Sequence, residues 1–259
     1  MIPWIESHSI PVIFVLAFAL CYLIAGVIYL AAVLMPAGVA ADLKATSPPM
    51  LTPVAVIIGL LIGFLAARVW GNVDHAHAFL ADEASALGRA VLFADSVGPE
   101  AGAAMRRSVT DYVRFVDAED WPTMATGSAT LAEEPPALVG ALHALLAATP
   151  SQPGPVVAQR QAALAIEQAL GARHGRILLS QRVISPLQWS AVLLQAALVM
   201  ATVAMVHIDR RRTIAVNLFV YATGIAICLV LLLVNDRPFS GREASLPPAP
   251  LHDMVAGLH

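Results

Sequence analysis

The sequence predicts an all-α integral membrane protein, with four transmembrane helices and a helical-bundle insert between the second and the third. Three observations support this fold class. The chain is 58% hydrophobic and only 13% charged, about half of the charged fraction of a typical soluble domain. Aromatic residues make up only 6% of it, and Ala, Val and Leu, which suit helices, dominate the apolar residues. Finally, four apolar runs are long enough to cross a bilayer.

These four runs cover residues 11–35, 52–70, 187–208 and 213–234. A bilayer-spanning helix needs about 20 apolar residues, and each such helix satisfies its own backbone hydrogen bonds in lipid. The residues before the first run include Glu6 and no Lys or Arg, whereas a signal peptide begins with basic residues, so we expect a retained anchor. We assign residues 1–70 to the first two transmembrane helices and residues 186–234 to the last two.

The insert, residues 71–185, has the apolar spacing of helices. Its expected helices are a continuation of the second span as far as Pro99, then residues 100–121, 135–149 and 156–182. Pro122 is expected to end the second of these helices, because proline cannot continue a helical hydrogen-bond ladder. The Pro-rich tail, residues 235–259, is expected either to lie against this bundle or to be loosely ordered.

The charges of the two short loops indicate an orientation. Four spans place the insert and both termini on one side of the membrane and the short loops on the other. The loop at 207–213 is strongly basic, and the other short loop carries Asp42 and Lys44. Counting positive charges places these loops in the cytoplasm and the insert outside. Arginines at the ends of the insert and in the tail oppose this count, but they are spread over many more residues.

Several classes of function are excluded by composition and spacing. A net charge of −3 argues against nucleic-acid binding, which needs a concentrated basic patch. Cys21 and Cys228 lie inside apolar runs, without the spacing of a metal site or a disulfide framework. His75 and His77 are two residues apart, so they point in different directions on a helix and make poor joint ligands. No cofactor or metal is expected.

Acidic residues of the insert do not form a catalytic set. Glu83, Asp111, Glu119 and Asp120 are accompanied by no nucleophile–base arrangement and no phosphate-binding loop. Asp111 with Arg114, three residues later, fits an ordinary helical ion pair. The segment from Glu119 is interpreted as a helix end. We therefore do not expect an enzyme.

Two stretches resemble the bestrophin-like family of bacterial four-span membrane proteins, and a third resembles the bestrophin channels. Residues 67–88, "ARVWGNVDHAHAFLADEASALG", are similar to that family's helix after the second span. Residues 111–124, "DYVRFVDAEDWPTM", are similar to its tyrosine-containing helix that closes in an acidic-Trp-Pro turn. "DRPFSG", residues 236–241, resembles the exit turn after the last span of bestrophin channels, here Pro238, Phe239 and Gly241 with Ser240 inserted.

The layout matches this family along nearly the whole chain. The resemblance implies a multi-pass protein of the bacterial inner (plasma) membrane that assembles with copies of itself, in a pentamer. It also implies a cytoplasmic insert, in contrast to the charge count. The acidic cluster that follows the exit turn in bestrophins has no counterpart here, since Glu243 and Asp253 are isolated, so a calcium site of that type is not expected.

The second span offers two interpretations. Small residues recur every four positions at Gly59, Gly63 and Ala67, and such a face lets helices approach closely in lipid, within or between subunits. The resemblance implies instead that this span lines an apolar neck. One turn of the helix would then face a pore that gates by dewetting, and its candidate residues are Ile57, Leu60, Leu61 and Phe64.

Charged residues at the span ends also have two interpretations. Arg68 beside Trp70 fits ordinary interfacial anchoring, or a ring of arginines that attracts anions at a pore mouth. Asp236 and Arg237 fit either a capping ion pair at a helix stop or a charged vestibule.

We expect an oligomeric, anion-conducting channel of the bestrophin-like type. The alternative is a non-conducting accessory or scaffold subunit whose insert docks another protein of a membrane complex. In both cases the expected partners are the lipid bilayer and further membrane subunits, and no nucleic acid.

Overall fold

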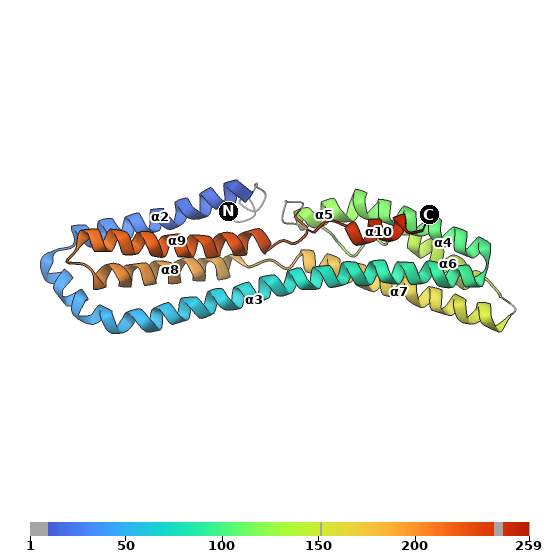
Figure 1. The fold of residues 1–259 in the computed structure, drawn as a ribbon, viewed down its shortest axis with the longest axis horizontal. Coiled ribbons are helices and arrows are strands. Elements are labelled where there is room, and N and C mark those ends of the chain that lie inside the picture. Colours follow the sequence, from blue (N-terminus) through green and yellow to red (C-terminus); the bar gives the residue numbers. More distant parts are fainter. Residues whose placement is uncertain (1–9, 151, 241–245, 259) are drawn as a thin grey trace. The chain divides into compact units, whose positions relative to one another are not determined.

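The computed structural model describes residues 10–150, 152–240 and 246–258, without the side chains of residues 45–47. Throughout these ranges the regular structure is helical, which confirms the all-α prediction (Figure 1). Within the described residues, four helices are long and apolar enough to span a membrane, namely α2 (Ile10–Leu34), α3 (Ala37–Val97, from Pro48 onward), α8 (Pro186–Val206) and α9 (Arg211–Asn235). The prediction of four spans is thus confirmed.

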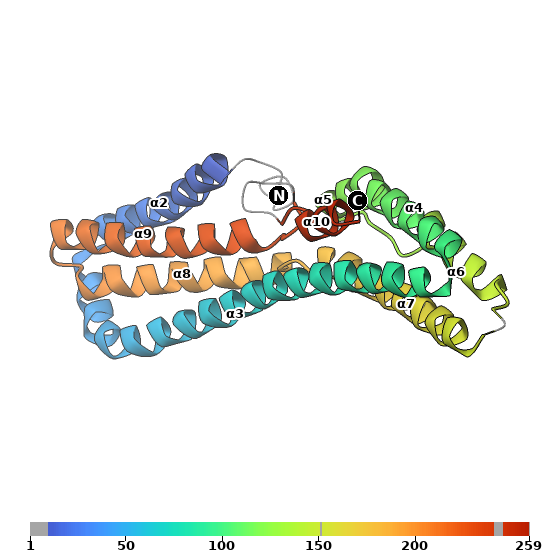
Figure 2. The ribbon, with the colours of Figure 1, turned by 45° about the vertical axis from the view of Figure 1, so that its right-hand side comes forward.

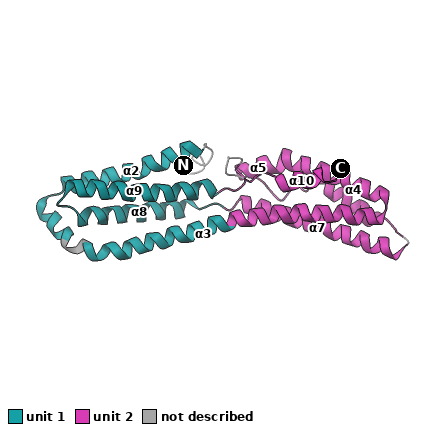
Figure 3. Ribbon diagram, viewed as in Figure 1, with its two compact units in different colours: residues 1–71, 183–236 teal, residues 72–182, 237–259 magenta. Residues whose placement is uncertain are grey.

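The chain divides into two compact units (Figure 3). Unit 1 comprises Met1–Gly71 and Val183–Asp236 and holds the four apolar spans, and unit 2 comprises Asn72–Arg182 and Arg237–His259. Helix α3 contributes to both units, because no helix breaker occurs between its apolar span and Val97. The second span thus continues as a helix to Val97, two residues before Pro99, as the sequence predicted.

In unit 1, α2, α8 and α9 pack side by side along most of their length (Figures 1 and 2). Helix α2 buries residues of every fourth position, Ile13, Ala17, Cys21 and Ala25. The hydroxyl groups of Tyr22 and Thr223 share a hydrogen bond of 2.8 Å between α2 and α9. Gln195 of α8 donates to the carbonyl oxygen of Val54 in α3 over 3.3 Å, which attaches the second span to this bundle.

The connection between the first two spans differs from the expectation. The sequence predicted a loop around Asp42 and Lys44, but α3 already begins at Ala37, because the Ala-rich segment after Pro36 has high helix propensity. Three prolines, Pro48, Pro49 and Pro53, lie inside the helix, and the ribbon changes direction in this segment (Figure 1). Lys44 forms an ion pair with Asp209, so the two short connections lie at the same end of unit 1.

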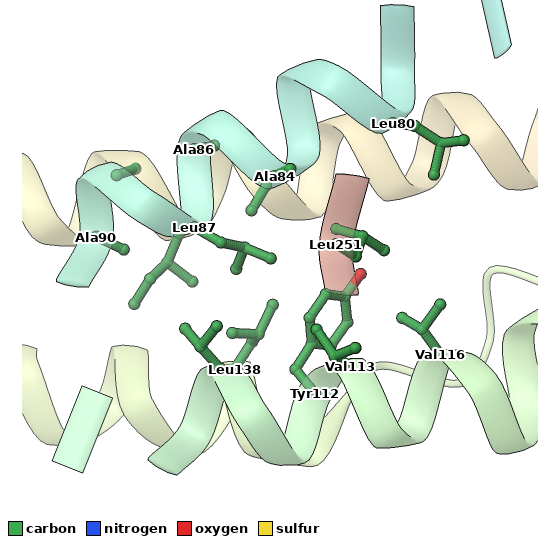
Figure 4. Packing of buried hydrophobic residues seen from close by; sticks show 14 of the residues in the cluster. Leu80, Ala84, Ala86, Leu87, Ala90, Tyr112, Val113, Val116, Leu138 and Leu251 are labelled. Atoms are coloured by element: carbon green, nitrogen blue, oxygen red, sulfur yellow. The ribbon is translucent and has the colours of Figure 1, made fainter. Parts of the chain in front are cut away.

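Unit 2 is a helical bundle around one core. It contains the last part of α3, α4 (Pro99–Phe115), α6 (Pro136–Ala147), α7 (Pro153–Ser180) and α10 (Ala249–Ala256). Figure 4 shows Leu87 of α3 and Leu138 of α6 facing the same interior as Tyr112 of α4. The tail helix α10 packs on α4 and buries Leu251 completely, so this part of the tail lies against the bundle.

The helix after Pro99 does not end at Pro122, so that prediction was wrong. Helix α4 continues into a π-helix, η1 (Val116–Asp120), and then into α5 (Trp121–Thr126). The N–H group of Trp121 donates to the carbonyl of Val116, five residues earlier, so the helix is already wider where the proline ring must fit. The true end is Gly127, whose φ of 71° is left-handed and suits glycine.

Candidate functional site

Helix α3 turns only one face toward the core of unit 1. Ile58, Leu65 and Val69 are buried there, at the spacings of seven and four residues that place side chains on one helix face. Leu61 is half-buried and packs against the same core. The opposite face of this apolar helix is left uncovered by the described part of unit 1.

Two stripes lie side by side on the uncovered face. The bulky stripe is Ile57, Leu60 and Phe64, whose exposed fractions are 54%, 57% and 73%. The small-residue stripe is Gly59, Gly63 and Ala67, all exposed. A Cβ atom added at either glycine would meet no other described atom within 4 Å, so the small-residue stripe is not used for packing within the described chain.

Arg68 follows the bulky stripe by one helical turn and is held by the start of α8. Its guanidinium donates to the side-chain oxygen of Gln188 over 3.1 Å and to the carbonyl of Val183 over 3.4 Å. Gln188 also closes a capping box with Ser185 at the N-terminus of α8. Arg68 is therefore exposed yet positioned, with its charge at one end of the stripe.

Asp236 is buried at the end of α9. Both of its carboxylate oxygens accept the backbone N–H of Ile184, at 3.0 and 3.1 Å, which fixes the connection that leads into α8. Arg237, the other predicted charge of this pair, is half-buried. The carboxylate thus serves the internal fold of unit 1 rather than facing an open surface.

The exit turn, which begins at Pro238, directly follows this pair of charged residues. The N–H of Ser240 donates to the carbonyl of Arg237 over 3.3 Å, and the N–H of Leu246 donates to the carbonyl of Pro238 over 2.8 Å. Phe239 is buried, and its ring meets Trp121 edge-on with centroids 5.6 Å apart. Gly241, the last residue of the predicted turn, lies outside the described residues.

Five buried polar side chains from α3, α4, η1 and α7 meet in the core of unit 2. We name them the buried charge cluster: Glu83, Tyr112, Asp120, Arg173 and Arg176, none of which is more than 4% exposed. With two carboxylates and two guanidinium groups, the cluster balances its formal charge. Charged side chains are almost never fully buried unless they are paired in this way.

Arg176 is at the centre of this cluster. Its Nε and Nη2 donate to the two carboxylate oxygens of Glu83 at 2.9 and 3.1 Å, and Nη2 also reaches Asp120 at 3.2 Å. The hydroxyl of Tyr112 donates to Glu83 as well. Burial alone would lower the pKa of Arg176, but the charges of Glu83 and Asp120 raise it above its ordinary value. Arg176 therefore stays charged.

Tyr112 and Arg173 complete the arrangement. Burial, together with the adjacent Glu83 carboxylate, raises the pKa of Tyr112 well above its usual value, so its phenol stays neutral and donates. Arg173 forms a fork with Asp120, at 2.9 and 2.8 Å, and donates to the carbonyl of Glu133 over 3.0 Å. Such charge-assisted forks fix orientation as well as distance.

The buried charge cluster connects its four elements, α3, α4, η1 and α7, to the exit turn through Trp121. The guanidinium of Arg176 lies over the ring of Trp121, 5.1 Å from its centroid, and Trp121 in turn contacts Phe239. Every acid and base in it is paired and buried, which suits a structural anchor and not proton transfer to a substrate. Among the described residues, no group of three or more His, Cys, Asp or Glu side chains is placed as metal ligands would be.

Sequence reasoning missed this cluster. It counted the arginines at the ends of the insert, Arg173 and Arg176 among them, only for the membrane orientation, and it interpreted Asp120 as part of a helix end. A usable signal was present, because the two arginines continue the apolar stripe of α7 after Ile166 and Ala169, at spacings of three and four residues. The stretches that carried the family resemblance also contain Glu83, Tyr112 and Asp120, which the fold brings together.

Comparison with known proteins identifies the family and the fold of the chain. A family model described as the bestrophin-like domain matches residues 18–251, and this confirms the resemblance to the bestrophin-like family that the sequence predicted. A crystal structure of a bacterial bestrophin homolog from Klebsiella pneumoniae, in a point-mutant form, superposes with a TM-score of 0.67 at 13% identity, covering 95% of this chain and 97% of that one. A second crystal structure, of a mutant membrane protein, gives a TM-score of 0.64 at 12% identity over the same shares of both chains. No curated protein matches the sequence.

Proposed function

Because the chain belongs to the bestrophin-like family, and its four apolar helices make it a membrane protein, we propose that it forms a homo-oligomeric, anion-conducting channel. In this channel, copies of α3 surround a central axis, and the bulky stripe of Ile57, Leu60 and Phe64 forms an apolar neck. The bacterial bestrophin homolog with the same fold supports this choice.

The observation that carries the proposal is the uncovered face of α3. In the most apolar 18-residue stretch of each candidate span, the share of residues buried within the chain is lowest for α3, at 11%, and is 22% to 39% for the other three. Its small-residue stripe suits close approach of a neighbouring helix, yet the described chain supplies none. A second copy on that stripe leaves the adjacent bulky stripe turned toward an axis.

In the proposed channel, the apolar neck acts as the gate, and Arg68 gives the preference for anions. A ring of Leu and Phe side chains can close a pore by dewetting, without any charged gate. The Arg68 guanidinium lies one turn from Phe64 and is held by Gln188, so the ring that it forms attracts anions to the mouth. In our proposal the pore-lining candidates are therefore Ile57, Leu60 and Phe64, with Leu61 as packing support from the core side.

Recordings from purified protein in planar bilayers test this function. We expect Leu60→Ala and Phe64→Ala to raise the chloride current, because a wider neck stays hydrated. Leu194→Ala is the matched control, since Leu194 is similarly exposed on α8 but outside the stripe. Arg68→Gln should move the reversal potential in a chloride gradient toward zero, whereas Arg68→Lys should largely preserve it.

Two results would overturn the proposal. One is a monomeric mass for the protein extracted in mild detergent. The other is silence of the wild type and of both neck variants across anions and cations, which would favour the non-conducting scaffold subunit.

We further propose the bacterial inner membrane as its location. A C-terminal reporter fusion decides the side of unit 2. Active alkaline phosphatase would support the external insert that the basic loop at 207–213 favours. Fluorescence from a fused green fluorescent protein would support the cytoplasmic insert that the family resemblance implies.

A further inference from the structure

The basic connection between α8 and α9 has no role in the proposed channel. It carries three consecutive arginines, all exposed, and we name them the arginine cluster: Arg210, Arg211 and Arg212. The acid that precedes them, Asp209, is already paired with Lys44. Among the described residues, none of the three arginine side chains has a hydrogen-bond or ion-pair partner. Three positive charges thus lie at this end of unit 1 without an internal counter-ion.

The start of α9 adds to this positive potential. Arg211 and Arg212 are in its first turn, and no described side chain caps the helix. The N–H groups of a first helical turn have no acceptor within the helix, and the helix dipole places a partial positive charge there. Arginine also forms forked hydrogen bonds to phosphate oxygens. A phosphate group therefore suits the arginine cluster.

An uncovered apolar face of α9 adjoins the arginine cluster. We name it the outer face, and it consists of Val216, Phe219 and Val220, which are 61%, 59% and 63% exposed. These residues follow Arg212 by four, seven and eight positions, so all four lie on one side of the helix. The ring of Phe219 stacks on Tyr22 of α2, with centroids 5.6 Å apart, which holds it in place. Unpaired charge and exposed apolar surface are therefore neighbours on one helix.

A ligand that satisfies both surfaces must itself be amphiphilic. A soluble anion would pair with the arginine cluster but would leave the outer face uncovered. Because α9 is one of the four apolar spans, its outer face is turned toward the hydrocarbon region, and its basic end lies where phospholipids carry their phosphate groups. A negatively charged phospholipid supplies a phosphate at one depth and an acyl chain at the other.

We propose that the arginine cluster and the outer face together bind one anionic phospholipid per chain. Its phosphate contacts Arg211 and Arg212, and an acyl chain lies along Val216 and Val220. This site is independent of conduction, since the protein can bind lipid there whether or not α3 lines a pore. It is also independent of the side of the membrane on which unit 2 lies.

A lipid titration followed by native mass spectrometry tests the site. The full-length protein, delipidated in mild detergent, is titrated with phosphatidylglycerol or with phosphatidylcholine of identical acyl chains. We expect one retained phosphatidylglycerol per chain and at least about tenfold weaker retention of phosphatidylcholine, whose headgroup has no net charge. Inorganic phosphate and glycerophosphoglycerol, the deacylated headgroup, should not displace the lipid at equal concentration, because neither covers the outer face.

Charge variants test the arginine cluster. Arg211→Gln combined with Arg212→Gln should weaken phosphatidylglycerol retention about 20- to 30-fold, since each arginine near an anionic lipid surface contributes about fivefold. The double change to lysine keeps both charges and should preserve most of the retention. Arg107→Gln is the matched control, because Arg107 is also exposed but belongs to α4, outside the four apolar spans.

A variant of unchanged charge separates a site from diffuse attraction. Val216→Asn leaves every arginine in place but makes the outer face polar, and it should weaken phosphatidylglycerol retention about two- to fivefold. Leu194→Asn is its control, since Leu194 is similarly exposed on α8. Equal retention by these two variants would reduce the effect to diffuse attraction and overturn the inference.

Three other results would also overturn it. One is equal retention of phosphatidylglycerol and phosphatidylcholine. Another is displacement of the lipid by inorganic phosphate, which would make the arginine cluster a site for soluble anions. The third is a change of oligomeric mass in Val216→Asn, which would assign the outer face to contact with a second copy of the chain.

Discussion

Replacing Arg176 with methionine tests whether the buried charge cluster holds unit 2 together. Methionine has a similar length and fills the same space, but it carries no charge and no donor. The change removes two hydrogen bonds to Glu83, at 2.9 and 3.1 Å, and one to Asp120 at 3.2 Å. It also removes the cation from the face of Trp121.

The expected loss of stability follows from the hydrogen bonds that remain to Glu83 and Asp120 after this substitution. Glu83 is fully buried, and among the described residues only the Tyr112 hydroxyl would still bond to its carboxylate. Asp120 keeps its fork with Arg173. Removing one partner of a buried ion pair typically destabilises a protein by about 3–5 kcal/mol, because an uncompensated charge stays behind. Such a loss is a large part of the stability of a small domain.

Urea titration in detergent micelles, followed by circular dichroism and tryptophan fluorescence, measures this cost. With a denaturant slope of about 2 kcal/mol per molar, the midpoint of unfolding should fall by about 1.5–2.5 M. The control is Arg114→Met, since Arg114 is paired with Asp111 at an exposed position in the described part of the chain. That variant should change the free energy of unfolding by less than about 0.5 kcal/mol.

A double-mutant cycle separates the pair from its surroundings. If Glu83 and Arg176 act together, Glu83→Leu combined with Arg176→Met should cost less than the sum of the single changes, by about 0.5–3 kcal/mol. Strict additivity, or an Arg176→Met variant as stable as Arg114→Met, would refute the assignment of the cluster as the anchor of unit 2.

Three further predictions concern the same unit. Because the pKa of Tyr112 is raised on folding, the neutral phenol contributes fully to stability below about pH 10, the pKa of an unfolded tyrosine, and this contribution is lost as the pH rises toward the higher pKa of the folded state. Tyr112→Phe should remove this loss of stability at alkaline pH. Unfolding midpoints of the two proteins, measured across that pH range, test this. Gly102→Ala should destabilise by about 1–3 kcal/mol, because the new Cβ would lie 3.0 Å from the Cα of Asp95 and closer still to its carboxylate, whereas Gly140→Ala, with open space around it, should be neutral or stabilising; thermal midpoints of the two variants compare them directly. Phe239→Ala should cost about 3–5 kcal/mol in a urea titration, since the ring is 1% exposed and packs in the core of unit 2, and a loss below about 1 kcal/mol would contradict the role of the exit turn as an anchor.

The sequence alone determined the membrane class and the helical layout. Twenty or more apolar residues in a row admit few other structures, because lipid leaves every backbone group to be satisfied within its own helix. The same local reasoning placed the continuous helix after the second span. It was wrong at Pro122 and at Asp42 and Lys44, where a widened π turn and an Ala-rich segment allow the helix to continue.

Tertiary structure decided which side chains meet and which stay uncovered. Glu83, Asp120 and Arg176 are up to 93 residues apart, and nothing local distinguishes a buried guanidinium from a solvated one. Similarly, the run of apolar residues at 52–70 predicted the second span, but it did not show which face of this helix the rest of unit 1 would cover. Both outcomes depend on contacts between distant segments, whose pairing is set by the packing of the whole unit and not by the pattern along one helix.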